Sequence, residues 1–129
     1  PMSMGAAIAV GRKSLVVHGD GGFMFHATEL ATCAQYQVPL IICVFNDSGY
    51  GVLRYLQQTR FGRINETDLG KVAFAQMAES MGVPGERVAS VAQFAQAMDR
   101  AMAAKGPYLI DVDMEHFALM EISVMPKKK

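Results

Sequence analysis

The sequence has no net charge, no long hydrophobic run and few cysteines. Its 129 residues include twelve basic and twelve acidic side chains, a balance that gives no electrostatic reason to expect nucleic acid as a partner. No apolar run approaches the roughly 20 residues of a membrane-spanning helix. The first ten residues also lack the basic start of a signal peptide. We therefore expect neither nucleic-acid binding nor membrane insertion.

The two cysteines, Cys33 and Cys43, lie in apolar stretches without metal-ligand spacing. They are predicted to be buried free thiols, which is typical of a cytoplasmic protein. With 51% apolar and 19% charged residues, the composition is that of a globular protein. We expect residues 1–126 to form one domain and the three lysines at 127–129 to form a basic tail. The start without methionine leaves two interpretations open, a fragment of a longer chain and a separate subunit.

Short apolar runs alternate with helical patterns along the chain. Runs that are apolar throughout are typical of strands buried on both faces of a parallel sheet, and three occur: Leu15–His18, Leu40–Phe45 and Tyr108–Val112. Helices are predicted at Gly5–Val10 (short and buried), at Thr28–Gln37, and along two apolar stripes. The first stripe is Phe74, Met77, Ala78 and Met81, followed by Gly82. The second is Val91, Phe94, Ala95, Met98, Ala101 and Met102, with Ser90 and Gln93 as a capping box. This alternation predicts an α/β three-layer sandwich, in which helices flank a mainly parallel sheet.

Glycine-rich polar segments follow the first two predicted strands, His18–Gly22 and Asn46–Gly51. In parallel sheets ligands bind at the carboxyl ends of strands, where both segments fall. The glycines of the first allow backbone N–H groups to approach an anion, whereas Asp20 would repel a bare phosphate. A hard cation bound by Asp20 and bridging to phosphate resolves this conflict, and the second segment offers further oxygen ligands for Mg²⁺. The residues alone leave two interpretations open, a magnesium-phosphate site and two ordinary turns.

The spacing of these segments resembles the thiamine-diphosphate motif. Gly19-Asp20-Gly21 is followed after 24 residues by Asn46-Asp47, where the motif has GDG, a similar interval and NN. The agreement extends to Glu29–Thr32, Gln35-Tyr36, Pro39, Tyr50-Gly51, Leu53-Arg54 and Ala104–Val112. The resemblance covers nearly the whole chain. It implies the fold of the diphosphate-binding (PP) domain, the C-terminal domain of thiamine-diphosphate-dependent enzymes.

The resemblance also implies thiamine diphosphate and Mg²⁺ as cofactors and assigns roles by position. Side chains of Asp20 and Asp47 and the carbonyl of Gly49 would bind Mg²⁺, while Asn46 would support the loop. The full set of implied cofactor-binding residues is Gly19, Asp20, Gly21, Gly22, Asn46, Asp47, Gly49, Tyr50 and Gly51. One departure is Asp47, where the family has Asn. Its added charge is predicted to strengthen metal binding and to weaken the attraction for diphosphate slightly.

The implied activity is that of a 2-oxo-acid decarboxylase or carboligase acting on a small 2-oxo acid. The run Asn46–Arg54 is most similar to the benzoylformate decarboxylase group. An acetolactate synthase or pyruvate oxidase type of domain, or a non-catalytic assembly module, remain alternatives. In such enzymes the glutamate that activates the cofactor lies on a pyrimidine-binding (PYR) domain, and no glutamate here matches it. We therefore expect no catalytic residue in this chain, half of an active site, and a PYR-domain partner within a homo-oligomer.

Three further predictions concern residues near these segments. His18 and His26 are predicted to be structural, with His26 at the start of a helix. Arg54 is predicted to pair with a carboxylate, with contact to the substrate as the alternative. The apolar run Phe23–Phe25 is either part of the core or part of a domain interface.

Overall fold

The computed structural model describes residues 1–116, and the predicted basic tail at 127–129 lies outside them. These residues form one sheet of four parallel strands in the order β1-β2-β4-β3. The strands are β1 (Ser14–Gly19), β2 (Leu40–Asn46), β3 (Gly85–Val88) and β4 (Tyr108–Asp113). The described part contains no helix that is long and apolar enough to cross a membrane.

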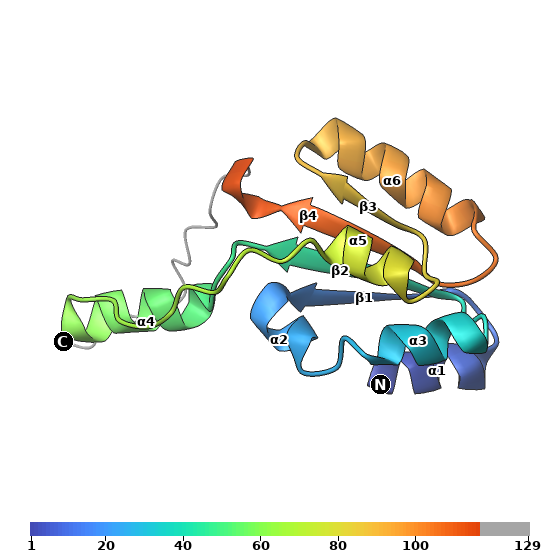
Figure 1. Cartoon of the computed structure of the whole chain (residues 1–129), viewed down its shortest axis with the longest axis horizontal. Helices are drawn as coiled ribbons and strands as arrows, with labels where there is room; N and C mark the ends of the chain where they lie inside the picture. Colours follow the sequence, from blue (N-terminus) through green and yellow to red (C-terminus); the bar gives the residue numbers. More distant parts are fainter. Residues whose placement is uncertain (117–129) are drawn as a thin grey trace.

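Helices cover both faces of the sheet, as Figure 1 shows. One face is covered by α1 (Met2–Val10), α2 (Asp20–Met24), α3 (Glu29–Gln35) and α5 (Phe74–Ser80). The other face is covered by α6 (Val91–Ala103), while α4 (Gly51–Phe61) extends away from the sheet. A short 3-10 helix, η1 (Met114–His116), follows β4. The predicted three-layer α/β sandwich with a parallel sheet is confirmed.

The two central strands are buried on both faces because helices cover both faces of the sheet. In β2, Ile42 and Val44 belong to the core under α3 and α5, whereas Ile41 and Cys43 belong to the core under α6. Every residue of β2 except Phe45 is buried, and β4 is buried from Leu109 to Asp113. The prediction of buried strands is correct for these two.

The prediction is wrong for β1, whose residues alternate between partly buried and exposed. Val16 packs against the core under α1, whereas Leu15 is 54% exposed and Val17 is 58% exposed. The physical reason is the position of β1 at the edge of the sheet. Helix α6 packs on β3 and β4, so it leaves the Leu15 side of β1 uncovered.

Two helices also differ from their predictions. Helix α1 begins earlier than expected and is mostly exposed, with Ala7 as its buried residue, so the prediction of a buried helix is wrong. In α6 one of the two bonds of the predicted capping box is present, because the Ser90 hydroxyl accepts from the Gln93 N–H at 3.2 Å. The Gln93 side chain accepts from the Ala89 N–H at 2.8 Å and not from the Ser90 N–H. The buried face of α6, however, centres on Ala97 and Ala101 with Phe94 and Met98 beside them. The remaining predicted members, Val91, Ala95 and Met102, are exposed.

The first stripe is confirmed. Phe74 and Ala78 of α5 are buried in the core, and Met77 and Met81 pack against it. Gly82 follows with a φ of +81°, the left-handed conformation expected for a residue just beyond a helix. Strand β3 was not predicted, because Val88 is its one large apolar residue.

Candidate functional site

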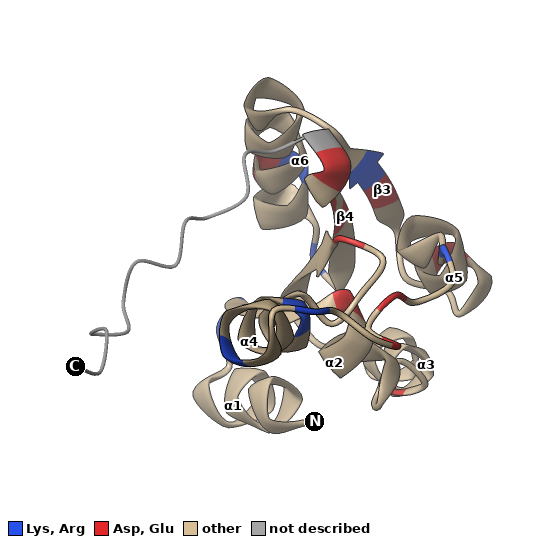
Figure 2. Ribbon diagram, turned by 90° about the vertical axis from the view of Figure 1, so that its left-hand side faces the viewer, with Lys and Arg blue, Asp and Glu red and all other residues tan. Residues whose placement is uncertain are grey.

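The two polar segments meet at the carboxyl edge of the sheet. Gly19 of β1 is in register with Phe45 of β2, so the chain leaves both strands at the same level. The first segment is not a free loop, since α2 begins at Asp20 and includes both following glycines. Figure 2 shows acidic positions gathered near these strand ends and basic positions along α4. The predicted proximity of the segments is confirmed.

Asp20 joins the two segments. Its side chain is buried, with 3% exposed. One carboxylate oxygen, Oδ1, accepts a hydrogen bond from the Gly21 N–H at 2.8 Å, and Oδ2 accepts one from the Gly49 N–H at 3.0 Å. Because a carboxylate oxygen has two lone pairs, both oxygens can still bind a further partner. The carboxylate is therefore fixed in place and still able to coordinate a cation.

Asp47 contributes a second carboxylate to the same place. Burial raises the pKa of Asp47, the nearby charge of Asp20 raises it further, and Arg54 lowers it. Arg54 Nη1 lies 3.6 Å from Asp47 Oδ2, and Arg54 Nη2 lies 2.8 Å from Asp68 Oδ1. The prediction that Arg54 pairs with a carboxylate is confirmed. Two carboxylates that repel each other are stabilised by a cation between them.

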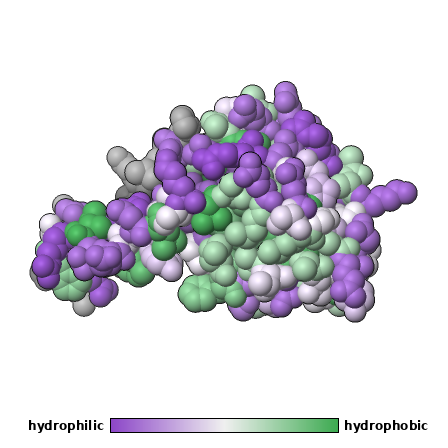
Figure 3. All heavy atoms as spheres, viewed as in Figure 1, coloured by the Kyte–Doolittle hydropathy of each residue, from purple (hydrophilic) through white to green (hydrophobic). Residues whose placement is uncertain are grey.

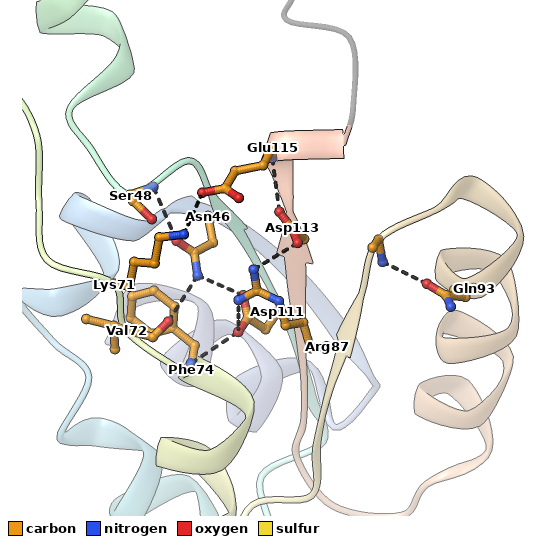
Figure 4. Close-up of polar contacts among 11 residues, drawn as sticks. Asn46, Ser48, Lys71, Val72, Phe74, Arg87, Gln93, Asp111, Asp113 and Glu115 are labelled. Carbon is orange, nitrogen blue, oxygen red and sulfur yellow. Dashed lines mark hydrogen bonds and ion pairs between the residues drawn. The ribbon is translucent and has the colours of Figure 1, made fainter.

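Asn46 supports the second segment through the hydrogen bonds of its side-chain amide. Its Nδ2 donates to the carbonyl of Val72 and to Asp111 Oδ1, each at 3.1 Å, and its Oδ1 accepts from the Ser48 N–H at 3.3 Å (Figure 4). Ser48 has a φ of +53°, a left-handed conformation that costs energy for a residue with a Cβ. The Asn46 amide therefore supports a loop that is conformationally strained.

A cleft of about 320 Å³ opens between the two segments. Every implied cofactor-binding residue except Asn46 lines it. An apolar wall completes it, formed by Phe45, Val52, Leu53 and Met114. A second hollow of about 330 Å³ shares Asp20, Gly21 and Tyr50 with the cleft. The cleft thus combines carboxylates, glycine backbone and an apolar wall in one place.

The glycines of the site fall into two kinds. A Cβ on Gly21 would overlap the Tyr50 ring, and one on Gly51 would lie 2.6 Å from Asp47 Oδ2. These glycines let the two segments pack closely. A Cβ on Gly19 or Gly22 would meet no atom within 4 Å, although both residues line the cleft. The second kind leaves space next to backbone N–H groups, which is what a diphosphate requires.

The donor set fits Mg²⁺ better than a transition metal. Across residues 1–116 there is no group of three or more His, Cys, Asp or Glu side chains that could hold a metal ion. A metal in the cleft would therefore be bound by two carboxylates and backbone oxygen, with other ligands from phosphate or water. Mg²⁺ is typically bound in this way, because it keeps water and binds through one or two carboxylates plus substrate phosphates.

Residues around the site have structural roles or remain open. The His18 ring contacts Phe23 with centroids 6.0 Å apart, and burial lowers the pKa of His18. His26 lies in a turn between α2 and α3, so the prediction that it starts a helix is wrong.

Phe23 is buried in the core, whereas Met24 is 47% and Phe25 75% exposed. Figure 3 shows hydrophobic spheres over α2 and on α4. Phe23 is therefore part of the core, as one of the two interpretations predicted, and a domain interface at Met24 and Phe25 remains a prediction.

Sequence reasoning missed two parts of this region. The apolar wall of the cleft comes partly from Val52 and Leu53 of α4, and nothing in their pattern distinguishes them from core residues. The buried acid Asp111 was assigned no role. Its signal was available, because an ionisable residue within an apolar strand requires polar partners when the strand is buried.

Known proteins resemble the chain over most of its length. Residues 1–112 match the family model described as thiamine pyrophosphate enzyme, C-terminal TPP binding domain. The chain is 37% identical to acetolactate synthase from Bacillus subtilis (strain 168) over 117 residues, which are 90% of this chain and 20% of that protein. It is 34% identical to indole-3-pyruvate decarboxylase from Azospirillum brasilense over 110 residues, covering 84% of this chain and 19% of that protein.

A solved structure shows the same fold. The thiamine diphosphate-dependent 4-hydroxybenzoylformate decarboxylase from Rhodococcus jostii RHA1 aligns with a TM-score of 0.81 and 34% identity. The alignment covers 86% of this chain and 21% of that chain. The chain thus spans about a fifth of the length of these relatives. The matched family model, the sequence relatives and the shared fold agree: this chain belongs to the family of C-terminal thiamine-pyrophosphate-binding domains of thiamine pyrophosphate enzymes.

Proposed function

We propose that the cleft binds Mg²⁺ and, through it, the diphosphate of thiamine diphosphate. Asp20 and Asp47 would bind the metal through their side chains and Gly49 through its carbonyl. Backbone N–H groups of α2 and the Gly51 N–H at the start of α4 would contact the phosphate oxygens beside it. The observation that carries this proposal is the Asp20 carboxylate, which is buried, tied to Gly49 and close enough to Asp47 to repel it.

The residues of this chain would bind and orient the cofactor and exclude water from it. The apolar wall of the cleft faces the same space as the carboxylates and lowers its polarity. When bound, thiamine diphosphate supplies an electron sink for bond cleavage next to a carbonyl. No residue of this chain is assigned a proton-transfer role. The activating glutamate would come from a PYR domain, and the complete site would form in a homo-oligomer.

For the whole protein we propose a cytoplasmic 2-oxo-acid decarboxylase or carboligase of the benzoylformate decarboxylase type. The 4-hydroxybenzoylformate decarboxylase neighbour supports this choice. The acetolactate synthase relative supports the second candidate, an acetolactate synthase type. Joining the chain to its PYR domain and analysing the products separates the two. Release of an aldehyde from an aromatic 2-oxo acid supports the first type, and formation of acetolactate from pyruvate supports the second.

Calorimetry on the 129-residue chain tests the binding proposal. Titration with thiamine diphosphate should give heat in the presence of Mg²⁺ and much less after chelation. Asp20→Asn should weaken this binding strongly. Asp68→Asn is the control, since Asp68 pairs with Arg54, as Asp47 does, but unlike Asp20 and Asp47 it does not line the cleft. If the affinity for thiamine diphosphate changes neither on removal of Mg²⁺ nor in Asp20→Asn, the proposal is refuted and a non-catalytic assembly module is favoured.

A further inference from the structure

Asp111 is a buried acid outside the cleft. It lies in β4, is 0% exposed, and is in register with Val44 of β2 and Arg87 of β3. Its oxygens face three donors. Oδ1 accepts from Asn46 Nδ2 at 3.1 Å, Oδ2 accepts from the Phe74 N–H at 3.2 Å, and Arg87 Nη1 lies 3.6 Å from Oδ2. A buried carboxylate with this many partners is held in a single orientation.

The contacts of Asp111 determine which way the Asn46 amide faces. The amide nitrogen lies between two acceptors, Asp111 Oδ1 and the Val72 carbonyl, so the amide oxygen must face the Ser48 N–H. Turning the amide over would set its oxygen against both acceptors and its nitrogen against the Ser48 donor. Figure 4 shows this series of bonds running from Arg87 through Asp111 and Asn46 to Ser48.

The loop that contains Ser48 carries two of the three proposed metal ligands, Asp47 and Gly49. Ser48 has a φ of +53° and is followed by Gly49, whose N–H donates to Asp20 Oδ2. The segment 67–69 holds the loop on its other side, where the Tyr50 N–H donates to the Thr67 carbonyl and the Leu69 N–H to the Ser48 carbonyl. From the sheet side, the side-chain oxygen of Asn46 at the end of β2 accepts a hydrogen bond from the Ser48 N–H of this loop.

We infer that Asp111 is a positioning residue for the metal-binding loop, acting through Asn46. The inference rests on the proposed function of the cleft, because it concerns the affinity of the site for Mg²⁺. Without two acceptor oxygens at position 111, the Asn46 amide loses its fixed orientation and the strained Ser48 conformation loses a constraint. Replacing a group that is hydrogen-bonded to a metal ligand typically changes metal affinity by about 10- to 100-fold. Asp111 acts on the loop through Asn46 and not on a ligand directly, so the lower end of this range, about tenfold, is the smallest effect that we expect.

Asp111→Asn tests the inference with almost no change of shape. An asparagine has one acceptor and one donor group. Its oxygen is expected on the side of the Phe74 N–H and the Arg87 guanidinium, so its NH₂ faces Asn46 Nδ2 and the bond that orients the Asn46 amide is lost. Asp113→Asn is the matched control. Asp113 is also buried, and Arg87 Nη2 lies 2.9 Å from its Oδ2, but this variant keeps Asp111 and its bond to Asn46.

Two measurements on the full chain separate positioning from general stability. Amide hydrogen exchange by NMR, without ligand, should be faster at Ser48 and Gly49 in Asp111→Asn and unchanged there in Asp113→Asn. Electron paramagnetic resonance of Mn²⁺, used as the metal probe together with thiamine diphosphate, should show at least about tenfold weaker binding in Asp111→Asn. Asp113→Asn should stay within about twofold of the original chain.

A folded Asp111→Asn chain with unchanged exchange or unchanged Mn²⁺ affinity would overturn the inference. If Asp111→Asn does not fold, Asp111→Glu keeps the charge and both acceptors but moves them by one methylene, and the same two results are required of it. If the original chain itself does not bind Mn²⁺ with thiamine diphosphate, the proposed function fails. Exchange at Ser48 and Gly49 then still decides whether Asp111 holds the loop.

Discussion

Two adjacent glycines in α2 should respond to alanine in opposite ways. Gly21 is buried, and a Cβ there would overlap the Tyr50 ring. Gly22 is exposed, lines the cleft, and a Cβ there would meet no protein atom within 4 Å. Both residues are helical, so alanine removes the same backbone freedom from the unfolded chain at either position.

The expected magnitudes follow from these surroundings. Replacing a helical glycine with alanine favours folding by up to about 0.5–1 kcal/mol. At Gly22 no clash opposes this gain, so the ligand-free chain should become slightly more stable. At Gly21 the overlap with Tyr50 adds an overpacking cost of about 1–3 kcal/mol, so the net effect should be destabilising. A methyl group at Gly22, however, occupies space that the diphosphate would fill.

Urea unfolding with and without Mg²⁺ and thiamine diphosphate measures both effects. A ligand at a hundred times its dissociation constant raises the free energy of unfolding by about 2.7 kcal/mol. The original chain should show this increase at saturating ligand. Gly22→Ala should lose most of it despite its greater ligand-free stability. A ligand-free Gly22→Ala chain that is destabilised would contradict the open space beside Gly22. A Gly22→Ala chain that keeps the full ligand-dependent increase would show that this space is not the diphosphate site.

Three further predictions address charge and thiol chemistry. The pKa of Glu86 is lowered in the folded chain, mainly by the hydrogen bond from Arg100. The Glu86 carboxylate therefore stabilises the fold at pH values above the pKa that it has in the unfolded chain, and this stabilisation is lost as the pH falls through the pKa of the folded chain. Glu86→Gln should therefore flatten the acid side of a plot of urea midpoint against pH, and an unchanged slope would contradict it. Asp47→Asn should weaken Mn²⁺ binding several-fold in paramagnetic resonance without lowering ligand-free stability, because repulsion from a neighbouring carboxylate is removed. Burial raises the pKa of Cys43 to about 11, so at pH 8 about one thiol in a thousand is ionised. It should react with an aromatic disulfide reagent only in urea, and rapid labelling of the native chain would contradict its burial.

The sequence predicted the parts of the fold where one local signal decides the outcome. The run Leu40–Phe45 is apolar throughout because helices cover both faces of β2. The same kind of run at β1 gave a wrong prediction, since the pattern does not say whether a strand is central or at an edge. Strand β3 was missed for the converse reason. An edge strand needs few apolar residues, and Glu86 of β3 pairs instead with a side chain of α6.

The candidate site could be predicted from the sequence because its residues lie in two short segments. Glycines and acids directly after strands placed Asp20 and Asp47 at one edge of the sheet, and the structure brings them to one cleft. The supporting residues could not be found in this way. The link between Asn46 and Asp111 spans 65 residues and depends on β4 lying beside β2. Topology of this kind is a property of the assembled sheet and not of any local pattern.

The edge position of β1 has a consequence for handling the chain in solution. Within residues 1–116 this strand pairs on one side with β2 and has no strand on the other. An open edge with exposed apolar side chains such as Leu15 and Val17 is a template for adding strands from other molecules. Charged residues often block such growth, but the Lys13 ammonium next to β1 donates to the Ala101 carbonyl at 2.7 Å. Concentrated samples should therefore be prone to ordered aggregation, and a proline or lysine at Val17 is the first substitution to try against it.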